Sequence, residues 1–143
     1  MAGTQTLAII KPDAVASERS GRILAHLQEA GFTVRALRMT RLARAEAEAF
    51  YAVHRGRPFY GSLCAFMTSG PCVPMVLERA DAVLHLRAVI GATDPAEAAA
   101  GTVRKLYAES KERNAIHASD SDENAAREIG FFFSEAERTG LWG

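Results

Sequence analysis

Short apolar segments that alternate with longer helical segments restrict the fold of this chain more than any other feature of its sequence. Residues 6–10 are rich in β-forming side chains and stop at Pro12, which lacks a backbone donor and ends a strand. Ile23 and Leu27 lie on one helical face, and from Phe32 the apolar period changes to two. The same reasoning predicts helices over 20–30, 43–53, 59–68, 81–90 and 121–129, strands over 6–10, 32–38, 73–77 and near 116, and an irregular loop over 91–101.

The order of these segments, β-α-β-α-α-β-α-loop-β-α, indicates an α+β fold. Its rhythm suggests a ferredoxin-like sandwich, in which helices lie on the face of a four-stranded antiparallel sheet. A small doubly wound sheet has the same rhythm, so the order alone leaves both topologies open. No repeat, low-complexity tract or linker divides the sequence, and 143 residues suit one core, so residues 1–143 are expected to form a single domain.

Charge and composition argue against several classes of partner. Seventeen Lys and Arg balance seventeen Asp and Glu, whereas a protein that binds DNA or an anionic membrane usually has a basic surplus. Nucleic acid is therefore not expected as the main partner. Cys64 and Cys72 lack the spacing of a zinc site and are expected to be packed, reduced thiols. The N-terminus has no secretory pattern and no apolar run approaches the roughly 20 residues that cross a bilayer, so a soluble, cytoplasmic protein with no membrane partner is expected.

The common phosphate-binding and hydrolase motifs are missing. Residues 56–62 have two glycines at the spacing of a P-loop, but Ser62 stands where that loop needs lysine, and no strand precedes it. The motifs GxGxxG, HExxH and GxSxG are absent as well. A nucleotide site in this chain must therefore be built in another way.

Residues 113–121, RNAIHASDS, carry the strongest chemical signal. His117 ends a short apolar step, and Asp120 is expected to cap the following helix, with Glu123 completing a capping box. Backbone N–H groups and the dipole at a helix start favour an anion, so His117 could accept a phosphoryl group or donate a proton to one. A partly buried histidine beside an ordinary cap is the alternative interpretation.

This segment, with Glu128 after it, resembles the Asn-x-x-His-Gly-Ser-Asp signature of nucleoside diphosphate kinases. Five other segments match the family in its order and at its spacings, and the resemblance runs from about residue 6 to residue 133. These segments are Ile10-Lys11-Pro12-Asp13, Arg57-Pro58-Phe59, Ser69-Gly70-Pro71, Gly91-Ala92-Thr93-Asp94-Pro95 and Gly101-Thr102-Val103-Arg104. Separated motifs in register over most of the chain are not expected by chance.

The resemblance implies a ping-pong kinase with broad base and sugar tolerance. A nucleoside triphosphate, typically ATP, phosphorylates a histidine, and a nucleoside diphosphate then takes the phosphate away. His117 matches that nucleophile. Glu128 matches the acid that hydrogen-bonds the other ring nitrogen, and Ser119 matches the residue that hydrogen-bonds this acid.

The resemblance also implies how the phosphates are held. Lys11, Arg87 and Arg104 match the family's cationic clamp, and Thr93 and Tyr51 match its hydroxyl donors. Each of these residues alone would more often be a surface charge or a packed hydroxyl.

The remaining matches concern the nucleoside and the metal ion. Asn114 matches a residue that contacts the sugar and phosphates, and Phe59 matches the aromatic ring on which the base stacks. Mg²⁺ is expected to enter with the nucleotide phosphates. Asp120 could assist it through water, and no direct metal ligand is expected.

Two positions depart from the family pattern. The family usually has glycine after the histidine, where this chain has Ala118. If that position needs a positive φ, alanine costs about 1–2 kcal/mol; otherwise its methyl group only crowds the neighbour of the nucleophile. Leu106 stands where the family often has aspartate, so the contacts of Arg104 are expected to be rearranged. An active enzyme is still expected.

The family forms dimers that assemble into tetramers or hexamers, so the resemblance implies a homo-oligomer. Trp142 is expected to pack on a neighbour or on the chain's own core. Three other functions stay open. A non-catalytic nucleotide- or partner-binding module would bind nucleotide without a phosphoenzyme, a single-stranded nucleic acid binder is opposed by the neutral charge, and an effector-sensing domain would need no reactive histidine.

Overall fold

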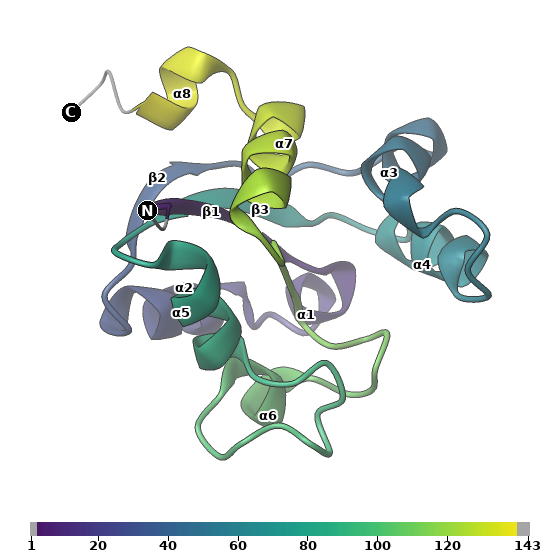
Figure 1. Cartoon of the computed structure of the whole chain (residues 1–143). Helices are drawn as coiled ribbons and strands as arrows, with labels where there is room; N and C mark the ends of the chain where they lie inside the picture. Colours follow the sequence, from purple (N-terminus) through teal and green to yellow (C-terminus); the bar gives the residue numbers. More distant parts are fainter. Residues whose placement is uncertain (1–2, 140–143) are drawn as a thin grey trace.

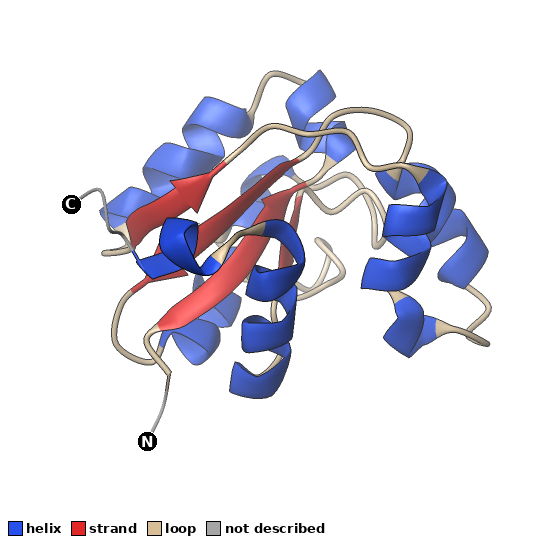
Figure 2. Ribbon diagram, turned by 90° about the horizontal axis from the view of Figure 1, so that it is seen from above, coloured by secondary structure: helices blue, strands red, loops and turns tan. Residues whose placement is uncertain are grey.

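The fold is built on a four-stranded antiparallel sheet. The computed structural model describes residues 3–139, and Trp142 lies outside them. The strands are β1 (Gln5–Ile10), β2 (Thr33–Leu37), β3 (Val73–Glu78) and β4 (Ile116–Ala118), in the spatial order β2-β3-β1-β4. Every pair of neighbouring strands is antiparallel, which confirms the ferredoxin-like α+β fold and excludes a doubly wound sheet, whose strands run mostly parallel (Figure 2).

Helices connect the strands in the predicted rhythm. The predicted helices form α2 (Ser20–Glu29), α3 (Arg44–Phe50) with the 3-10 turn η1 (Ala52–His54), α4 (Tyr60–Met67), α5 (Ala82–Ile90) and α7 (Asp122–Phe132). Three further helices are absent from the prediction, namely α1 (Pro12–Ala16), α6 (Val103–Tyr107) and α8 (Glu135–Thr139). Each has only five residues, too few to display an apolar period.

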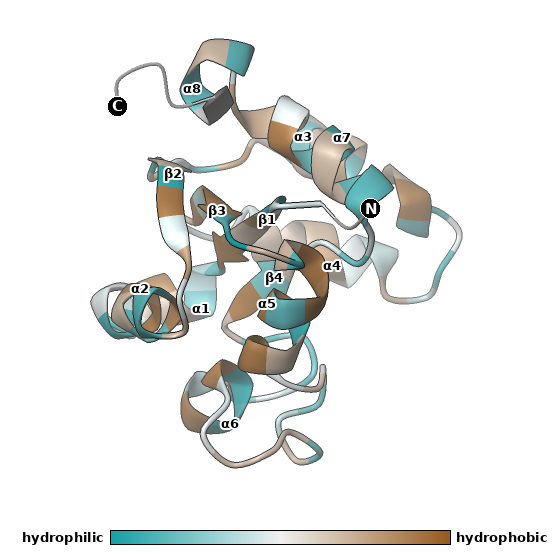
Figure 3. Cartoon of the chain, turned by 60° about the vertical axis from the view of Figure 1, so that its left-hand side comes forward, coloured by the Kyte–Doolittle hydropathy of each residue, from teal (hydrophilic) through white to brown (hydrophobic). Residues whose placement is uncertain are grey.

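Helices cover both faces of the sheet. In β1, Ala8 and Ile10 belong to one buried cluster with residues of α2 and α5, whereas Leu7 and Ile9 belong to another with residues of α3, α4 and α7. Figure 1 shows α2 and α5 on the side of the sheet opposite to α7, with α3 and α4 together at one end. Hydrophobic residues are concentrated on β3 and α5 (Figure 3). The inner strand β1 is therefore packed on both faces, and the site lies beside it.

The fold bears on the state of the two cysteines and on the presence of a membrane-spanning helix. Cys64 and Cys72 are free and buried, as predicted. Within residues 3–139, no helix is both long and apolar enough to span a membrane.

Candidate active site

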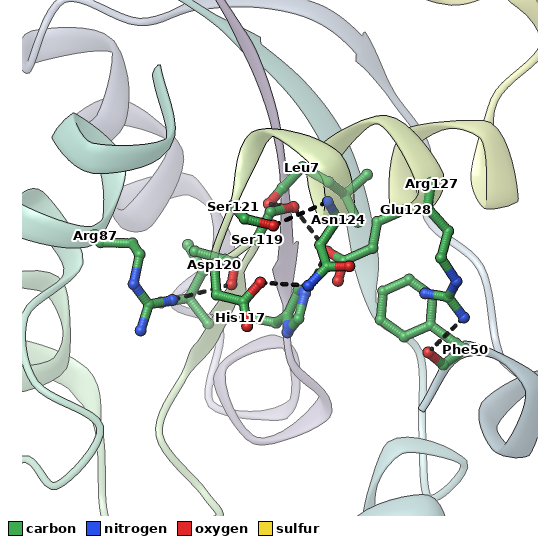
Figure 4. A network of polar contacts seen from close by, with 12 residues as sticks. Leu7, Phe50, Arg87, His117, Ser119, Asp120, Ser121, Asn124, Arg127 and Glu128 are labelled. Carbon is green, nitrogen blue, oxygen red and sulfur yellow. Dashed lines mark hydrogen bonds and ion pairs between the residues drawn. The ribbon is translucent and has the colours of Figure 1, made fainter. Parts of the chain in front are cut away.

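His117 lies in β4, directly beside the central strand. Its backbone pairs with Ile9 of β1, and its Nε2 lies 2.8 Å from Oε1 of Glu128 on α7 (Figure 4). Ser119 donates a 2.7 Å hydrogen bond to the same carboxylate oxygen. The side chains of His117 and Glu128 are only 18% and 11% exposed, so solvent competes little for this contact. The predicted link of histidine, acid and serine is therefore present.

This contact selects one form of the imidazole ring. An ionised carboxylate only accepts hydrogen bonds. Nε2 therefore carries the ring's hydrogen and donates a hydrogen bond to Glu128. Among the described residues, none is hydrogen-bonded to Nδ1 of His117. Nδ1 consequently keeps an unshared electron pair.

Two aromatic rings fix the orientation of the histidine. The ring centroids of Phe50 and Tyr51 lie 5.4 Å and 6.0 Å from that of His117, and both contacts are edge-on. The Tyr51 hydroxyl is buried and has no hydrogen-bond partner among residues 3–139. Burial, followed by the charge of Glu128, raises the pKa of Tyr51, so the hydroxyl stays protonated. It is an unused donor beside the histidine.

Lys11 and Asn114 meet although 103 positions separate them in the sequence. Nζ of Lys11 donates a 2.8 Å hydrogen bond to Oδ1 of Asn114, whose Nδ2 donates to the carbonyl oxygen of Thr93 at 3.2 Å. Burial, followed by the charge of Arg104, lowers the pKa of Lys11 to about 8. A nearby anion would oppose that shift, so this lysine is suited to an anionic ligand.

Two arginines bring further positive charge. Arg104 of α6 is buried, and its guanidinium donates to the carbonyl oxygens of Gly91 at 3.0 Å and Ile116 at 2.8 Å. Burial, followed by the charge of Arg87, lowers its pKa to about 10, so it remains charged at neutral pH. Arg87 of α5 makes one long contact, 3.4 Å to the carbonyl oxygen of Ala118.

These groups surround a cavity of about 560 Å³. Nearly all of the predicted site residues line it, namely Lys11, Tyr51, Phe59, Arg87, Thr93, Arg104, Asn114, His117, Asp120 and Glu128. Ser119 does not line the cavity, because it lies behind Glu128 as its hydrogen-bond donor. The volume suits a ligand of nucleotide size.

Known proteins resemble the chain in sequence and in structure. The family model described as "Nucleoside diphosphate kinase" matches residues 4–138. A nucleoside diphosphate kinase of Chlorobium luteolum is 59% identical over 133 residues, which cover 93% of this chain and 95% of the relative. The chain belongs to the nucleoside diphosphate kinase family.

Solved structures of the family agree with this assignment. The nucleoside diphosphate kinase of Aquifex aeolicus superposes with a TM-score of 0.92 at 46% identity, covering 94% of this chain and 97% of that one. A nucleoside diphosphate kinase from Halobacterium salinarum, solved in complex with CDP, superposes with a TM-score of 0.89 at 37% identity, covering 93% and 89%. As a nucleoside diphosphate kinase family member, the protein is an enzyme of phosphoryl transfer between nucleotides.

The departure at Ala118 does not strain the backbone of this kinase. Ala118 lies in β4, and its φ is not positive. The left-handed conformation occurs instead at Ala115, with φ of 74°. Ala115 is held there by Lys11, whose N–H donates to its carbonyl, and by Asp13, whose carboxylate accepts from its N–H. The suggested cost of a positive φ at Ala118 therefore does not arise.

The departure at Leu106 leaves Arg104 well held. Leu106 is 50% exposed on α6, while backbone carbonyl oxygens accept from two guanidinium nitrogens of Arg104. Nε of Arg104 is buried without a hydrogen-bond partner among the described residues. Backbone acceptors thus hold the arginine without the family's usual carboxylate.

The prediction for the helix start was wrong in detail. Ser121, not Asp120, is the N-cap of α7, and its hydroxyl accepts from the N–H of Asn124 at 3.1 Å. Asp120 instead accepts from the side chain of Asn124 at 2.6 Å, and Glu123 forms no capping box. Both Ser121 and Asp120 are good capping types, so the sequence alone could not separate them.

Several cavity residues escaped the sequence analysis. His54 lies between Tyr51 and Phe59, with ring centroids 6.2 Å and 5.2 Å away, and burial lowers its pKa. Arg127 donates to the carbonyl oxygen of Phe50 at 3.1 Å. The others are Val53, Leu63, Lys111, Glu112 and Asn124. Only their proximity in sequence to matched residues could have indicated them.

Proposed function

We propose that this kinase transfers the terminal phosphate of a nucleoside triphosphate, typically ATP, to a nucleoside diphosphate through a phosphohistidine at His117. The free electron pair of Nδ1 carries this proposal, because Glu128 occupies Nε2 and leaves Nδ1 as the nucleophile. In the first half-reaction an N–P bond forms at Nδ1, and the γ-phosphorus–oxygen bond breaks, so the diphosphate leaves with the electron pair. In the second, a terminal oxygen of another diphosphate attacks that phosphorus and the N–P bond breaks.

Glu128 and Ser119 are proposed to act through the histidine. When Nδ1 is phosphorylated the ring gains positive charge, and a carboxylate 2.8 Å from Nε2 stabilises that charge. Ser119 holds the carboxylate in line by donating to the same oxygen. Both are positioning residues that keep one nitrogen free.

The surrounding donors are proposed to stabilise the charge of the transferring phosphoryl group. Lys11, Arg87 and Arg104 converge on one cavity with the unused hydroxyl of Tyr51. Thr93 lines the same cavity and is exposed, so its hydroxyl can join these donors.

The nucleoside is proposed to lie toward Phe59. Phe59 is 44% exposed and lines the cavity, so a base of any kind can stack on its ring. Asn114 lines the cavity and donates to the carbonyl oxygen of Thr93. It is proposed to contact the sugar and phosphates. The complex of the Halobacterium relative with CDP supports nucleotides as ligands.

Mg²⁺ is proposed to arrive with the nucleotide. No cluster of three or more His, Cys, Asp or Glu side chains within residues 3–139 could hold a metal ion. Asp120 lines the cavity and is exposed, so its carboxylate fits a contact to the ion through water. The ion, when bound, neutralises phosphate charge.

The protein is also proposed to form a homo-oligomer and to act in the cytoplasm. Membership of the family supports a homo-oligomer built from dimers. The free, buried thiols of Cys64 and Cys72 are consistent with the reducing cytoplasm.

The proposal is tested by mixing the purified protein with γ-labelled ATP and Mg²⁺ in the absence of an acceptor. We expect an acid-labile, base-stable label on the chain that any nucleoside diphosphate discharges. His117→Ala should abolish the label, whereas His26→Ala, which removes a histidine of α2 that does not line the cavity, should retain it. ATP binding without any label would favour the alternative of a non-catalytic nucleotide-binding module.

A further inference from the structure

A carboxylate that the proposed reaction does not use lines the cavity on the side of Phe59. Glu112 lies in the loop between α6 and β4 and lines the cavity with Phe59 and Leu63. Its Oε2 accepts a 2.8 Å hydrogen bond from Oγ of Ser62 on α4, and this Oγ also lies 3.0 Å from the carbonyl oxygen of Phe59. The carboxylate is therefore tied to the start of the helix that follows the proposed stacking ring.

The fold holds this loop against α4 at a second point. The guanidinium carbon of Arg113 lies 5.4 Å from the centroid of the Phe66 ring on α4. Glu109 in turn pairs with Arg113 at 2.9 Å, but it does not line the cavity. Two successive loop residues, Glu112 and Arg113, thus rest on the same helix, which fixes where the carboxylate lies.

The Glu112 carboxylate has an acceptor available to a ligand. Within residues 3–139, its Oε1 makes no hydrogen bond, and an ionised carboxylate can only accept. The phosphates of a nucleotide would repel it. The part of a nucleotide that offers N–H donors is the edge of the base, and Phe59 beside Glu112 is where a base is proposed to stack.

We propose that Glu112 determines base preference by accepting hydrogen bonds from the base edge, and that it favours guanine. The inference rests on the phosphoryl-transfer function proposed above. Guanine presents two neighbouring donors, N1–H and its exocyclic amino group, which match the two oxygens of a carboxylate. Adenine and cytosine present one amino donor beside an acceptor. Uracil and thymine present one N–H between two carbonyl groups, which a carboxylate repels.

The test measures how fast different acceptors discharge the phosphoenzyme. The protein is labelled with γ-labelled ATP, and kcat/KM is determined for GDP, ADP, CDP and UDP. We expect GDP to exceed UDP by about fivefold, with ADP and CDP between them, a modest part of the discrimination of a buried bidentate pair. In Glu112→Gln the GDP-to-UDP ratio should fall to about one, while ADP should not lose rate, because an amide can both donate to and accept from adenine.

Two further variants separate a specific contact from a general charge effect. Glu109→Gln removes the same charge from the same loop, outside the cavity, and should leave the ratio unchanged. Ser62→Ala releases the Glu112 carboxylate from α4 and should give a ratio between those of the parent and Glu112→Gln.

Three outcomes would overturn the inference. One is a ratio of GDP to UDP near one in the parent protein, and another is an equal change for all acceptors in Glu112→Gln. If no label forms at all, the proposed function fails, and calorimetry with GDP and UDP then tests Glu112 separately. Equal affinities for GDP and UDP in that titration would be the third outcome that overturns the inference.

Discussion

The Glu128 carboxylate lies 2.8 Å from Nε2 of His117, on the side of the ring away from the free Nδ1. Replacing Glu128 by glutamine keeps an acceptor for Nε2 but removes the negative charge that stabilises the phosphorylated ring. We expect the rate of phosphoenzyme formation to fall about 100-fold, a typical loss for one preorganised electrostatic partner. Single-turnover labelling with γ-labelled ATP measures this rate. Glu123→Gln, an exposed change on the same helix, should keep the parent rate.

Nucleotide affinity should depend on pH through Lys11. Burial and the charge of Arg104 lower its pKa from 10.5 to about 8, so its positive charge is lost as the pH rises above that value. We expect ADP affinity to weaken between about pH 7 and about pH 9.5, because the neutral amine no longer attracts phosphate. Calorimetric titrations at several pH values measure it, and a flat profile would contradict the assignment.

The same shift predicts the sign of one contribution to stability. Between pH values of about 8 and 10.5 the unfolded chain keeps a proton on Lys11 that the folded chain has released. Because the unfolded state binds more protons there, the free energy of unfolding gains from this residue as the pH rises. Denaturant titrations of Lys11→Met should lack this contribution, and an equal rise in the variant would exclude it.

Tyr51→Phe should separate stability from activity. The Tyr51 hydroxyl is buried without a partner among the described residues, so removing it should raise the free energy of unfolding by about 1 kcal/mol. The proposed donation to phosphate is lost as well, so phosphoenzyme formation should slow by about tenfold. Urea denaturation and single-turnover labelling test the two effects. A less stable variant with an unchanged rate would refute both.

Gly91→Ala should destabilise the backbone that holds Arg104. Gly91 has φ of 90°, and an added Cβ would lie 2.5 Å from Oγ1 of Thr102, the N-cap of α6. The carbonyl oxygen of Gly91 also accepts a hydrogen bond from Arg104. Clash and strain together should lower the free energy of unfolding by about 3 kcal/mol. Gly56→Ala is the matched control, because its φ is 85° but the added Cβ meets open space. It should cost about 1 kcal/mol, and equal losses would mean that the clash is absent.

Ala118→Gly should not accelerate the enzyme. Ala118 lies in β4 without a positive φ, so glycine relieves no strain there and adds only flexibility to the unfolded chain. We expect an unchanged rate of phosphoenzyme formation and a free energy of unfolding lower by about 0.5–1 kcal/mol. A large increase in rate would indicate that the methyl group obstructs the nucleophile.

Local signals in the sequence determined most of the secondary structure and indicated many of the residues that line the cavity. The change from helical to alternating period at Phe32 located β2, and Pro12 marked the end of β1, because these patterns reflect which side chains face the core. The resemblance to the family indicated ten of the residues that line the cavity before any geometry was known. The five-residue helices and the choice of Ser121 as cap were not determined, because a single turn carries little periodic information.

Only the tertiary structure decided how those residues act together. Lys11 and Asn114 are 103 positions apart, and their hydrogen bond exists because β1 and β4 are neighbours in the sheet. Likewise, the sequence could not tell which ring nitrogen of His117 the Glu128 carboxylate reaches, or that Glu112 lies beside Phe59 through Ser62. Residue type sets which bonds a side chain can form, but distance and burial decide which of them it does form, and both depend on how the whole chain packs.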